Sequence, residues 1–236
     1  MKSLIKKCIY NFSPSVSQAG QDAWIFGEVF NGKKHGFFLD IGANDGLIHS
    51  NSYKLEQRFR WAGICVEANP DIFKNLKSNR RAMCINACLA DKTGEVYFRM
   101  DGEFGEVVSK NNRIESDIKL DSVPLEKVLK DNNAPYSIDY LSIDIEGSEE
   151  IVLRGFPFHI YTFKSITIER PSDMIRDLLK ENGYLLIKEI PDLDCFYIHK
   201  SFLNEYKKNM FKFWEKETFL PFFTKLKRYL VFQNDI

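Results

Sequence analysis

The stretch FLDIGANDG, residues 38–46, decides the fold class of this chain. It reads as a short apolar strand that ends in an acid, Asp40, followed by a turn with glycines at positions 42 and 46. A short, nearly all-apolar strand is typical of a parallel sheet, where both faces are buried. Glycines let the backbone pass close beneath a ligand, and open α/β sheets bind ligands at the carboxyl ends of their strands. The stretch therefore predicts a first parallel strand with a ligand site at its end.

Strand-like and helix-like segments alternate around this stretch, which indicates an α/β domain with a mostly parallel sheet. We expect strands at 36–41, 62–66, 82–89, 138–143 and 165–168, and an antiparallel pair at 184–190 and 195–199. Helices are expected at 51–59, 70–79, 123–132, 147–153 and 174–182. Residues 94–100 are expected to pair beside the core or form a hairpin, and residues 101–120 to form a loop or lid with at most one short strand.

Composition limits the classes of protein that fit. The 236 residues include 33 basic and 33 acidic ones, so no overall charge draws the chain to nucleic acid. Five scattered cysteines are typical of thiols in a reducing compartment. No apolar run has the length of a membrane-spanning helix or the core of a signal peptide. We expect a cytoplasmic protein with an N-terminal extension at 1–14, a main domain at 15–200 and a C-terminal extension at 201–236.

The C-terminal extension is rich in aromatic and basic residues, and Pro221 would divide it into two helices. Three alternatives follow for its aromatic side chains. They cover the core of the main domain, they form the interface of a homodimer, or they make a peripheral contact with a membrane surface.

Acids at the ends of the first two strands indicate a nucleoside ligand. The Gly-x-Gly-x-x-Gly spacing of dinucleotide sites is absent, and Asp40 would repel a pyrophosphate. An acid there suits a ligand with an ammonium group beside a nucleoside, which is S-adenosylmethionine. Glu67 follows the second strand, where an acid can accept both hydroxyls of a ribose; the alternative is that it caps the helix that begins at Pro70. The third strand runs into residues 86–91, which are placed to flank an adenine.

Acids also follow the fourth and fifth strands, and they are the candidates for catalysis. Asp144 and Glu146 are two residues apart and would face the same way, and Glu169 ends the next strand. Carboxylates that converge on one cleft serve as a general base for a hydroxyl or as oxygen ligands of a divalent cation such as Mg²⁺. The alternatives are that Glu146 or Glu149 caps the following helix and that Glu169 pairs with Arg170.

Taken together, these motifs resemble those of the FkbM family of class I S-adenosylmethionine-dependent methyltransferases, over about residues 15–200. The segments that carry the resemblance are SQAGQD at 17–22, FLDIGANDG at 38–46, SNSY at 50–53 with LE at 55–56, WAGICVEANP at 61–70, DYLSIDIEG at 139–147, ITIER at 166–170, NGY at 182–184 and DCFY at 194–197.

The resemblance implies a Rossmann-like fold, with a seven-stranded mostly parallel sheet, helices on both faces and one antiparallel edge strand. It also implies O-methylation, often of sugar hydroxyls in polysaccharides or natural products. Carried over to this chain, it assigns the methionine part of the cofactor to Asp40, Gly42, Asn44 and Gly46 and the ribose to Glu67. The other residues expected at the cofactor are Gln18, Gln21, Ser50, Ala68, Asn86, Ala87 and Asp144.

The preferred hypothesis is an S-adenosylmethionine-dependent O-methyltransferase that acts on a saccharide hydroxyl. Asp144 is then the general base, or it holds a divalent cation together with Glu146 or Glu169. The competing hypothesis is a non-catalytic scaffold with the same fold that works through its aromatic C-terminal extension. A nicotinamide-dependent oxidoreductase is the third alternative, and the absent dinucleotide motif and Asp40 speak against it.

Overall fold

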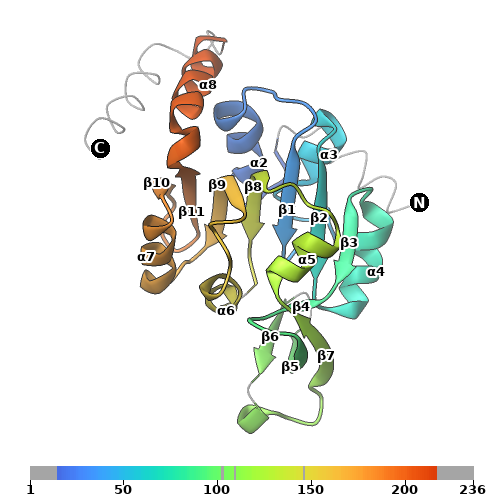
Figure 1. Cartoon of the computed structure of the whole chain (residues 1–236). Helices are drawn as coiled ribbons and strands as arrows, with labels where there is room; N and C mark the ends of the chain where they lie inside the picture. The colour runs from blue at the N-terminus through green and yellow to red at the C-terminus, as the bar shows by residue number, and fades with distance from the viewer. Residues whose placement is uncertain (1–14, 102–103, 109, 146, 217–236) are drawn as a thin grey trace.

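The structure, a computed structural model, describes residues 15–101, 104–108, 110–145 and 147–216. Its main element is a seven-stranded sheet in the order β10-β11-β9-β8-β1-β2-β3 (Figure 1). The strands are β1 (Phe37–Ile41), β2 (Ala62–Glu67), β3 (Met83–Asn86), β8 (Ser137–Ile143), β9 (Thr162–Glu169), β10 (Tyr184–Glu189) and β11 (Asp194–His199).

Strands β3, β2, β1, β8 and β9 pair in parallel, which confirms the mostly parallel sheet that the sequence predicts. One strand, β11, runs antiparallel to both of its neighbours, β9 and β10. The antiparallel pair predicted at 184–190 and 195–199 is confirmed at the edge of the sheet, but the one antiparallel strand was expected to be the edge strand itself. It is the second strand from the edge, because β10 pairs outside it.

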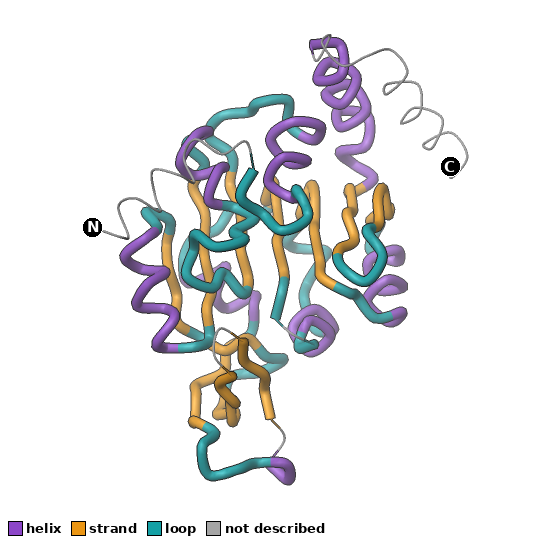
Figure 2. Tube along the Cα trace, turned by 180° about the vertical axis from the view of Figure 1, so that it is seen from behind, coloured by secondary structure: helices purple, strands orange, loops and turns teal. Residues whose placement is uncertain are grey.

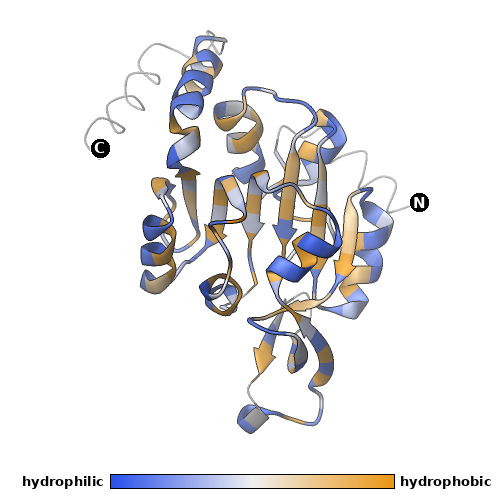
Figure 3. Cartoon of the chain, viewed as in Figure 1, coloured by the Kyte–Doolittle hydropathy of each residue, from blue (hydrophilic) through white to orange (hydrophobic). Residues whose placement is uncertain are grey.

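Helices cover both faces of this sheet, as Figures 1 and 2 show from opposite sides. Side chains alternate along β1, so that Leu39 and Ile41 join one apolar cluster while Phe38 joins the other. Figure 3 shows the hydrophobic residues concentrated in the strands between these layers. The first cluster contains residues of α5 (Leu125–Asp131), α6 (Glu149–Arg154) and α7 (Asp173–Glu181); the second contains residues of α2 (Gln21–Trp24), the π-helix η1 (Ile25–Val29), α3 (Tyr53–Phe59), α4 (Pro70–Asn79) and α8 (Leu203–Lys216).

A second, four-stranded sheet follows β3 in the chain and lies beyond one end of the large sheet (Figure 1). It consists of β4 (Cys88–Leu89), β5 (Gly94–Asp101), β6 (Phe104–Val108) and β7 (Ile118–Val123), with the short helix η2 (Lys110–Asn112) after β6. Two predictions were therefore wrong. The expected third strand at 82–89 is divided between the two sheets, and the segment 101–120 contains more than one strand.

The described part of the C-terminal extension begins with η3 (Lys200–Phe202) and α8. Phe202 and Tyr206 are buried, and both lie in the apolar cluster that contains Trp24 and Phe30. The beginning of the extension thus covers the core of the main domain, while Phe211 is exposed. The expected second helix after Pro221 lies outside the described residues. Within the part of the chain that is described, no helix has the length and apolar character needed to cross a bilayer.

A buried carboxylate near the start of β8, that of Asp139, accepts hydrogen bonds from two lysines and from the first residue of β1. Its Oδ1 accepts hydrogen bonds from Lys33 Nζ at 2.7 Å and Lys164 Nζ at 2.8 Å, and its Oδ2 accepts one from the Phe37 amide at 3.0 Å. Burial raises the pKa of Asp139, but the two ammonium groups outweigh it and hold the pKa below its usual range.

Asp139→Asn is expected to lower the free energy of unfolding by about 2 kcal/mol near neutral pH, since charge-assisted hydrogen bonds are lost. A lowered pKa in the folded state stabilises the protein above the unfolded pKa of about 3.9, and this stabilisation is lost as the pH falls through the folded value. Urea unfolding of both proteins at about pH 7 and about pH 3.5 should show a smaller difference at the lower pH. An equal difference at both pH values would contradict this role of the carboxylate.

Candidate functional site

A cavity of about 190 Å³ lies at the carboxyl ends of β1, β2 and β8, with residues of the small sheet on its wall. The strand order reverses between β1 and β8, because the chain proceeds from β1 to β2 and β3 on one side and continues with β8 and β9 on the other. Such a reversal is where open α/β sheets bind ligands. The predicted site residues on the wall of the cavity are Gln18, Asp40, Gly42, Asn44, Ser50, Glu67, Ala68, Ala87 and Asp144.

The glycine turn after β1 passes directly against the residue that follows β8. Gly42 has a φ of +79°, and a Cβ atom placed on it would lie 1.7 Å from the carbonyl oxygen of Asp144. The amides of Gly42 and Ala43 both donate to the carbonyl oxygen of Val66 at 3.0 Å, and the Asp144 amide donates to that of Ile41 at 3.0 Å. Only glycine fits this position, and the turn is fixed to both neighbouring strands.

The carboxylate of Glu67 is held by backbone amides. Its Oε2 accepts from the Asn44 amide at 3.0 Å and its Oε1 from the Asn69 amide at 2.8 Å. Burial raises the pKa of Glu67, although these amides act in the opposite direction. The predicted alternative, a helix cap, was wrong, because Asn69 caps α4 by accepting from the Asp71 and Ile72 amides. Each oxygen of Glu67 can still accept another hydrogen bond from a ligand hydroxyl.

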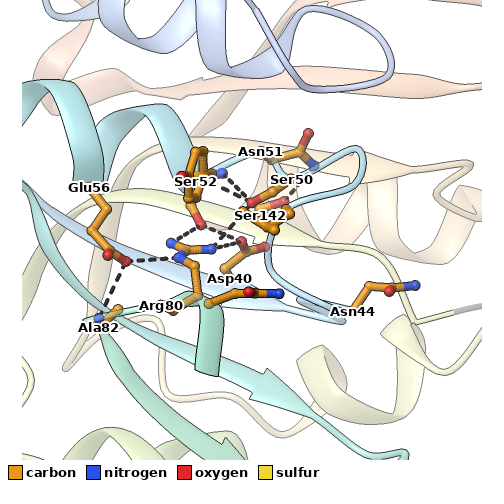
Figure 4. Close-up of polar contacts among 12 residues, drawn as sticks. Asp40, Asn44, Ser50, Asn51, Ser52, Glu56, Arg80, Ala82 and Ser142 are labelled. Carbon is orange, nitrogen blue, oxygen red and sulfur yellow. Dashed lines mark hydrogen bonds and ion pairs between the residues drawn. The ribbon is translucent and has the colours of Figure 1, made fainter. Parts of the chain in front are cut away.

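Asp40 lies at the centre of a buried polar network on the α3 and α4 side of the sheet (Figure 4). Its Oδ2 accepts a hydrogen bond from the Ser52 hydroxyl and lies 3.9 Å from Arg80 Nη1. Burial raises the pKa of Asp40, whereas Arg80 and the hydroxyls of Ser52 and Ser142 lower it. The carboxylate therefore lines the cavity and at the same time belongs to a network that extends away from it.

Arg80 holds this network together, and it was not among the predicted site residues. The side chain is fully buried, and its Nε donates to Glu56 Oε2 at 2.8 Å. Its Nη2 donates to Ser52 Oγ at 2.8 Å and its Nη1 to Ser50 Oγ at 3.3 Å (Figure 4). Nothing in the sequence distinguishes Arg80 from its neighbour Arg81, whose side chain is 69% exposed.

Several predicted cofactor residues lie outside the cavity wall. Gln21 donates through Nε2 to Asp194 Oδ2 at 2.6 Å, and its Oε1 accepts from the Ala19 amide, so that it orders the turn that carries Gln18. A Cβ atom on Gly46 would meet the side chains of Arg80 and Leu76, so this glycine faces the polar network. Asn86 donates to the carbonyl oxygens of Glu67 and Ala68 and lines a neighbouring hollow.

The predicted catalytic acids do not all converge. Asp144 is half-buried and lines the cavity. Glu169 does not line it; its carboxylate pairs with Arg170 at 2.8 Å, as the alternative expected, and it lies opposite Asp194 in the register of β9 and β11. Burial, together with the charge of Glu169, raises the pKa of Asp194 to about 6.

The remaining acids of this region have other positions. Glu149 is the first residue of α6, and its Oε1 accepts from the Ile145 amide at 3.0 Å; the expected alternative that it caps this helix was wrong, because Ser148 is at the N-cap position. Glu146 lies outside the described residues. Among the residues that the structure describes, no three histidine, cysteine, aspartate or glutamate side chains come together as a metal site, so the expected Mg²⁺ ligands Asp144 and Glu169 have no support there.

One family model matches this chain, and several solved structures are similar to it. A family model described as "Methyltransferase FkbM domain" matches residues 40–186. No curated protein matches this chain. Similar solved structures include methyltransferase FkbM from Methylobacillus flagellatus KT, with 16% identity and a TM-score of 0.46 over 70% of this chain and 44% of that one. The fibrillarin pre-rRNA processing protein of Methanococcus jannaschii has 13% identity and a TM-score of 0.45 over 80% and 77% of the two chains. This chain therefore spans less than half of the Methylobacillus protein.

Proposed function

Because this chain belongs to the FkbM methyltransferase family, we propose that it transfers a methyl group from S-adenosylmethionine to a hydroxyl group of a sugar. The proposed acceptor is a saccharide unit of a polysaccharide, a glycolipid or a glycosylated natural product. The observation that supports the proposal is the cavity, which the glycine turn, Glu67 and Asp144 all line. Neutral polar side chains such as Gln18, Asn51 and Ser148 line the same cavity, and they suit sugar hydroxyls, which both donate and accept hydrogen bonds.

The residues of the cavity fit the proposed cofactor chemically. Glu67 presents a fixed carboxylate for the two ribose hydroxyls. The backbone of residues 42–44 lines the cavity at the point where β1 ends, next to Asp40, whose charge suits an ammonium group. S-adenosylmethionine supplies a methyl group on a sulfonium that is already activated, so this chain has mainly to position the cofactor and the acceptor.

Glu67→Ala is expected to weaken the binding of S-adenosylhomocysteine by roughly 10-fold or more, since two hydrogen bonds from ribose hydroxyls to a carboxylate are lost. Calorimetric titration of the two proteins measures this change. Glu67→Gln is the matched control, because it keeps the length of the side chain and one acceptor oxygen, and it should give an intermediate affinity. Equal affinities of wild type and Glu67→Ala would remove Glu67 from the nucleoside site.

Asp144 is the proposed general base, because it lines the cavity beside the glycine turn. A sugar hydroxyl is a poor nucleophile near neutral pH, and a base that accepts its proton contributes roughly 10²- to 10⁴-fold to the rate. Asp144→Asn should therefore lose methyl transfer by about that factor, which is a larger loss than any change in its S-adenosylhomocysteine affinity. Transfer of a labelled methyl group to a panel of glycans, with and without magnesium, provides the assay. Near-normal turnover of the variant would exclude Asp144 as the base.

A further inference from the structure

One wall of the cavity is apolar and comes from the small sheet. Cys88 and Leu89 of β4, Phe98 of β5, and Gly105 and Val107 of β6 all line the cavity. Burial raises the pKa of the Cys88 thiol to about 11, so this side chain is neutral near pH 7 and behaves as part of the apolar surface. None of these residues belongs to the seven-stranded sheet that carries the glycine turn.

The aromatic ring of Phe98 packs directly on the backbone of Gly105, where a side chain would leave no room for it. A Cβ atom on Gly105 would lie 2.2 Å from Phe98 Cζ and 2.4 Å from its Cε1, so the ring rests directly on the glycine. Val107 lies opposite Phe98 in the antiparallel register of β5 and β6. Phe98 is only 5% exposed, yet it borders the cavity. The ring is therefore packed against Gly105 where it borders the cavity.

The order of the strands places this wall at one end of a bound nucleoside. Asp144 and Gly42 follow β8 and β1, Glu67 ends β2, and Ala87 follows β3. With the ribose at Glu67 and the amino acid part at Gly42, the base extends towards β3. The chain passes from β3 straight into β4, so the small sheet begins at this end. Adenine is the flat, largely apolar part of the cofactor, and an aromatic ring stacks well on it.

We infer that the ring of Phe98, supported by Gly105, forms one face of the binding site for the adenine of S-adenosylmethionine. This inference rests on the proposed function and assigns the small sheet to the cofactor. Residues 101–120, expected from the sequence to form a loop or lid, then supply Gly105 and Val107 to the adenine site.

The test is calorimetric titration with S-adenosylhomocysteine and with 5′-methylthioadenosine, which shares the adenine and ribose but lacks the amino acid part. Phe98→Ala is expected to weaken the binding of both ligands by the same factor. This factor is roughly 5- to 150-fold, the range for loss of one stacked aromatic ring. Phe98→Leu keeps an apolar side chain without the flat ring, so it should weaken both by a smaller factor. Tyr97→Leu is the matched control, because Tyr97 is the adjacent residue on β5, lies under Arg113 and does not line the cavity.

The outcomes separate the inference from the proposed function. Weakening of both ligands by Phe98→Leu, with unchanged affinity in Tyr97→Leu, supports the adenine site. If the unmodified protein binds both ligands and the Phe98 variants bind them equally well, the inference is wrong and the cofactor function stands. If the Phe98 variants bind only S-adenosylhomocysteine more weakly, Phe98 lies at the amino acid part of the cofactor, and the inference is also wrong. If the unmodified protein binds neither ligand, the proposed function fails and the inference fails with it. Far-UV circular dichroism identifies a misfolded Phe98→Ala protein, and Phe98→Leu then decides.

Discussion

Gly42→Ala is expected to abolish S-adenosylhomocysteine binding and to destabilise the protein by about 4 kcal/mol or more. The new Cβ atom would lie 1.7 Å from the carbonyl oxygen of Asp144, which belongs to the backbone and has no rotamer to change. Relief requires β1 and β8 to separate at the point where both line the cavity. For a chain of this length, such a loss corresponds to a melting temperature lower by roughly 10 °C, which differential scanning calorimetry measures.

Gly32→Ala separates the effect of this contact from the effect of backbone conformation. Gly32 has a φ of +78°, almost the same as that of Gly42, but no atom lies within 4 Å of a Cβ placed on it. Alanine at this position should lower the free energy of unfolding by only about 1 kcal/mol, which is the strain of a left-handed residue with a side chain. It should leave ligand affinity unchanged. Similar losses of stability in the two variants would show that the packing of Gly42 against Asp144 is unimportant.

Arg80→Met is expected to lower the free energy of unfolding by about 3–5 kcal/mol, because it leaves buried carboxylates without their cation. The guanidinium bonds to Glu56 at 2.8 Å and lies 3.9 Å from Asp40, and both carboxylates are almost fully buried. We also expect weaker S-adenosylhomocysteine binding, since Asp40 and Ser50 line the cavity and both contact Arg80. Urea unfolding and calorimetric titration provide the two measurements.

The matched control is Arg81→Met, which changes the adjacent arginine. Arg81 Nε lies 3.5 Å from Glu56 Oε1, but the Arg81 side chain is 69% exposed. Its replacement should therefore lower the free energy of unfolding by no more than about 1 kcal/mol.

The pH dependence of the Arg80→Met effect is a further check. Burial raises the pKa of Glu56, but Arg80 and the backbone amides outweigh it and leave the pKa below its usual range. The stabilisation by this pair is therefore present above the unfolded pKa of about 4.3 and is lost as the pH falls. The difference between wild type and Arg80→Met should shrink below about pH 5; a constant difference would contradict the ion pair as its cause.

The sequence predicted the Rossmann-like sheet well, because its evidence was local. Each parallel strand is a short apolar run followed by a turn, and at residues 38–46 the strand, the acid and both glycines stand together. The antiparallel pair of β10 and β11 is local in the same way, since only a short turn joins them. What no run of residues could indicate was the order of these two strands, which depends on β11 pairing with β9.

The small sheet was predicted only in part. Residues 94–100 were expected to pair beside the core or form a hairpin, and β5 does form a hairpin with β6, but the pairing of β4 with β7 is not local. The apolar run at 82–89 gives no sign that the chain leaves one sheet after Asn86 and enters another at Cys88. The partner of β4 is β7, about thirty residues later in the chain.

In the candidate site, acids at strand ends were found from their position in the sequence, but their partners were not. Glu67 was predicted at the cavity, whereas the amides that hold it come from the glycine turn and from Asn69. Arg80 was missed because a buried and an exposed arginine look alike in a sequence, and only the fold brings one of them to Asp40.

The most direct test of the account is to titrate the unmodified protein, in parallel, with S-adenosylhomocysteine and with NADH. The cavity at the end of β1, with Glu67 at its wall and no dinucleotide glycine pattern, predicts binding of S-adenosylhomocysteine at about micromolar concentration and no binding of NADH. A well-folded protein that binds neither ligand would contradict the account and favour a non-catalytic scaffold. Binding of NADH alone would contradict it in favour of an oxidoreductase.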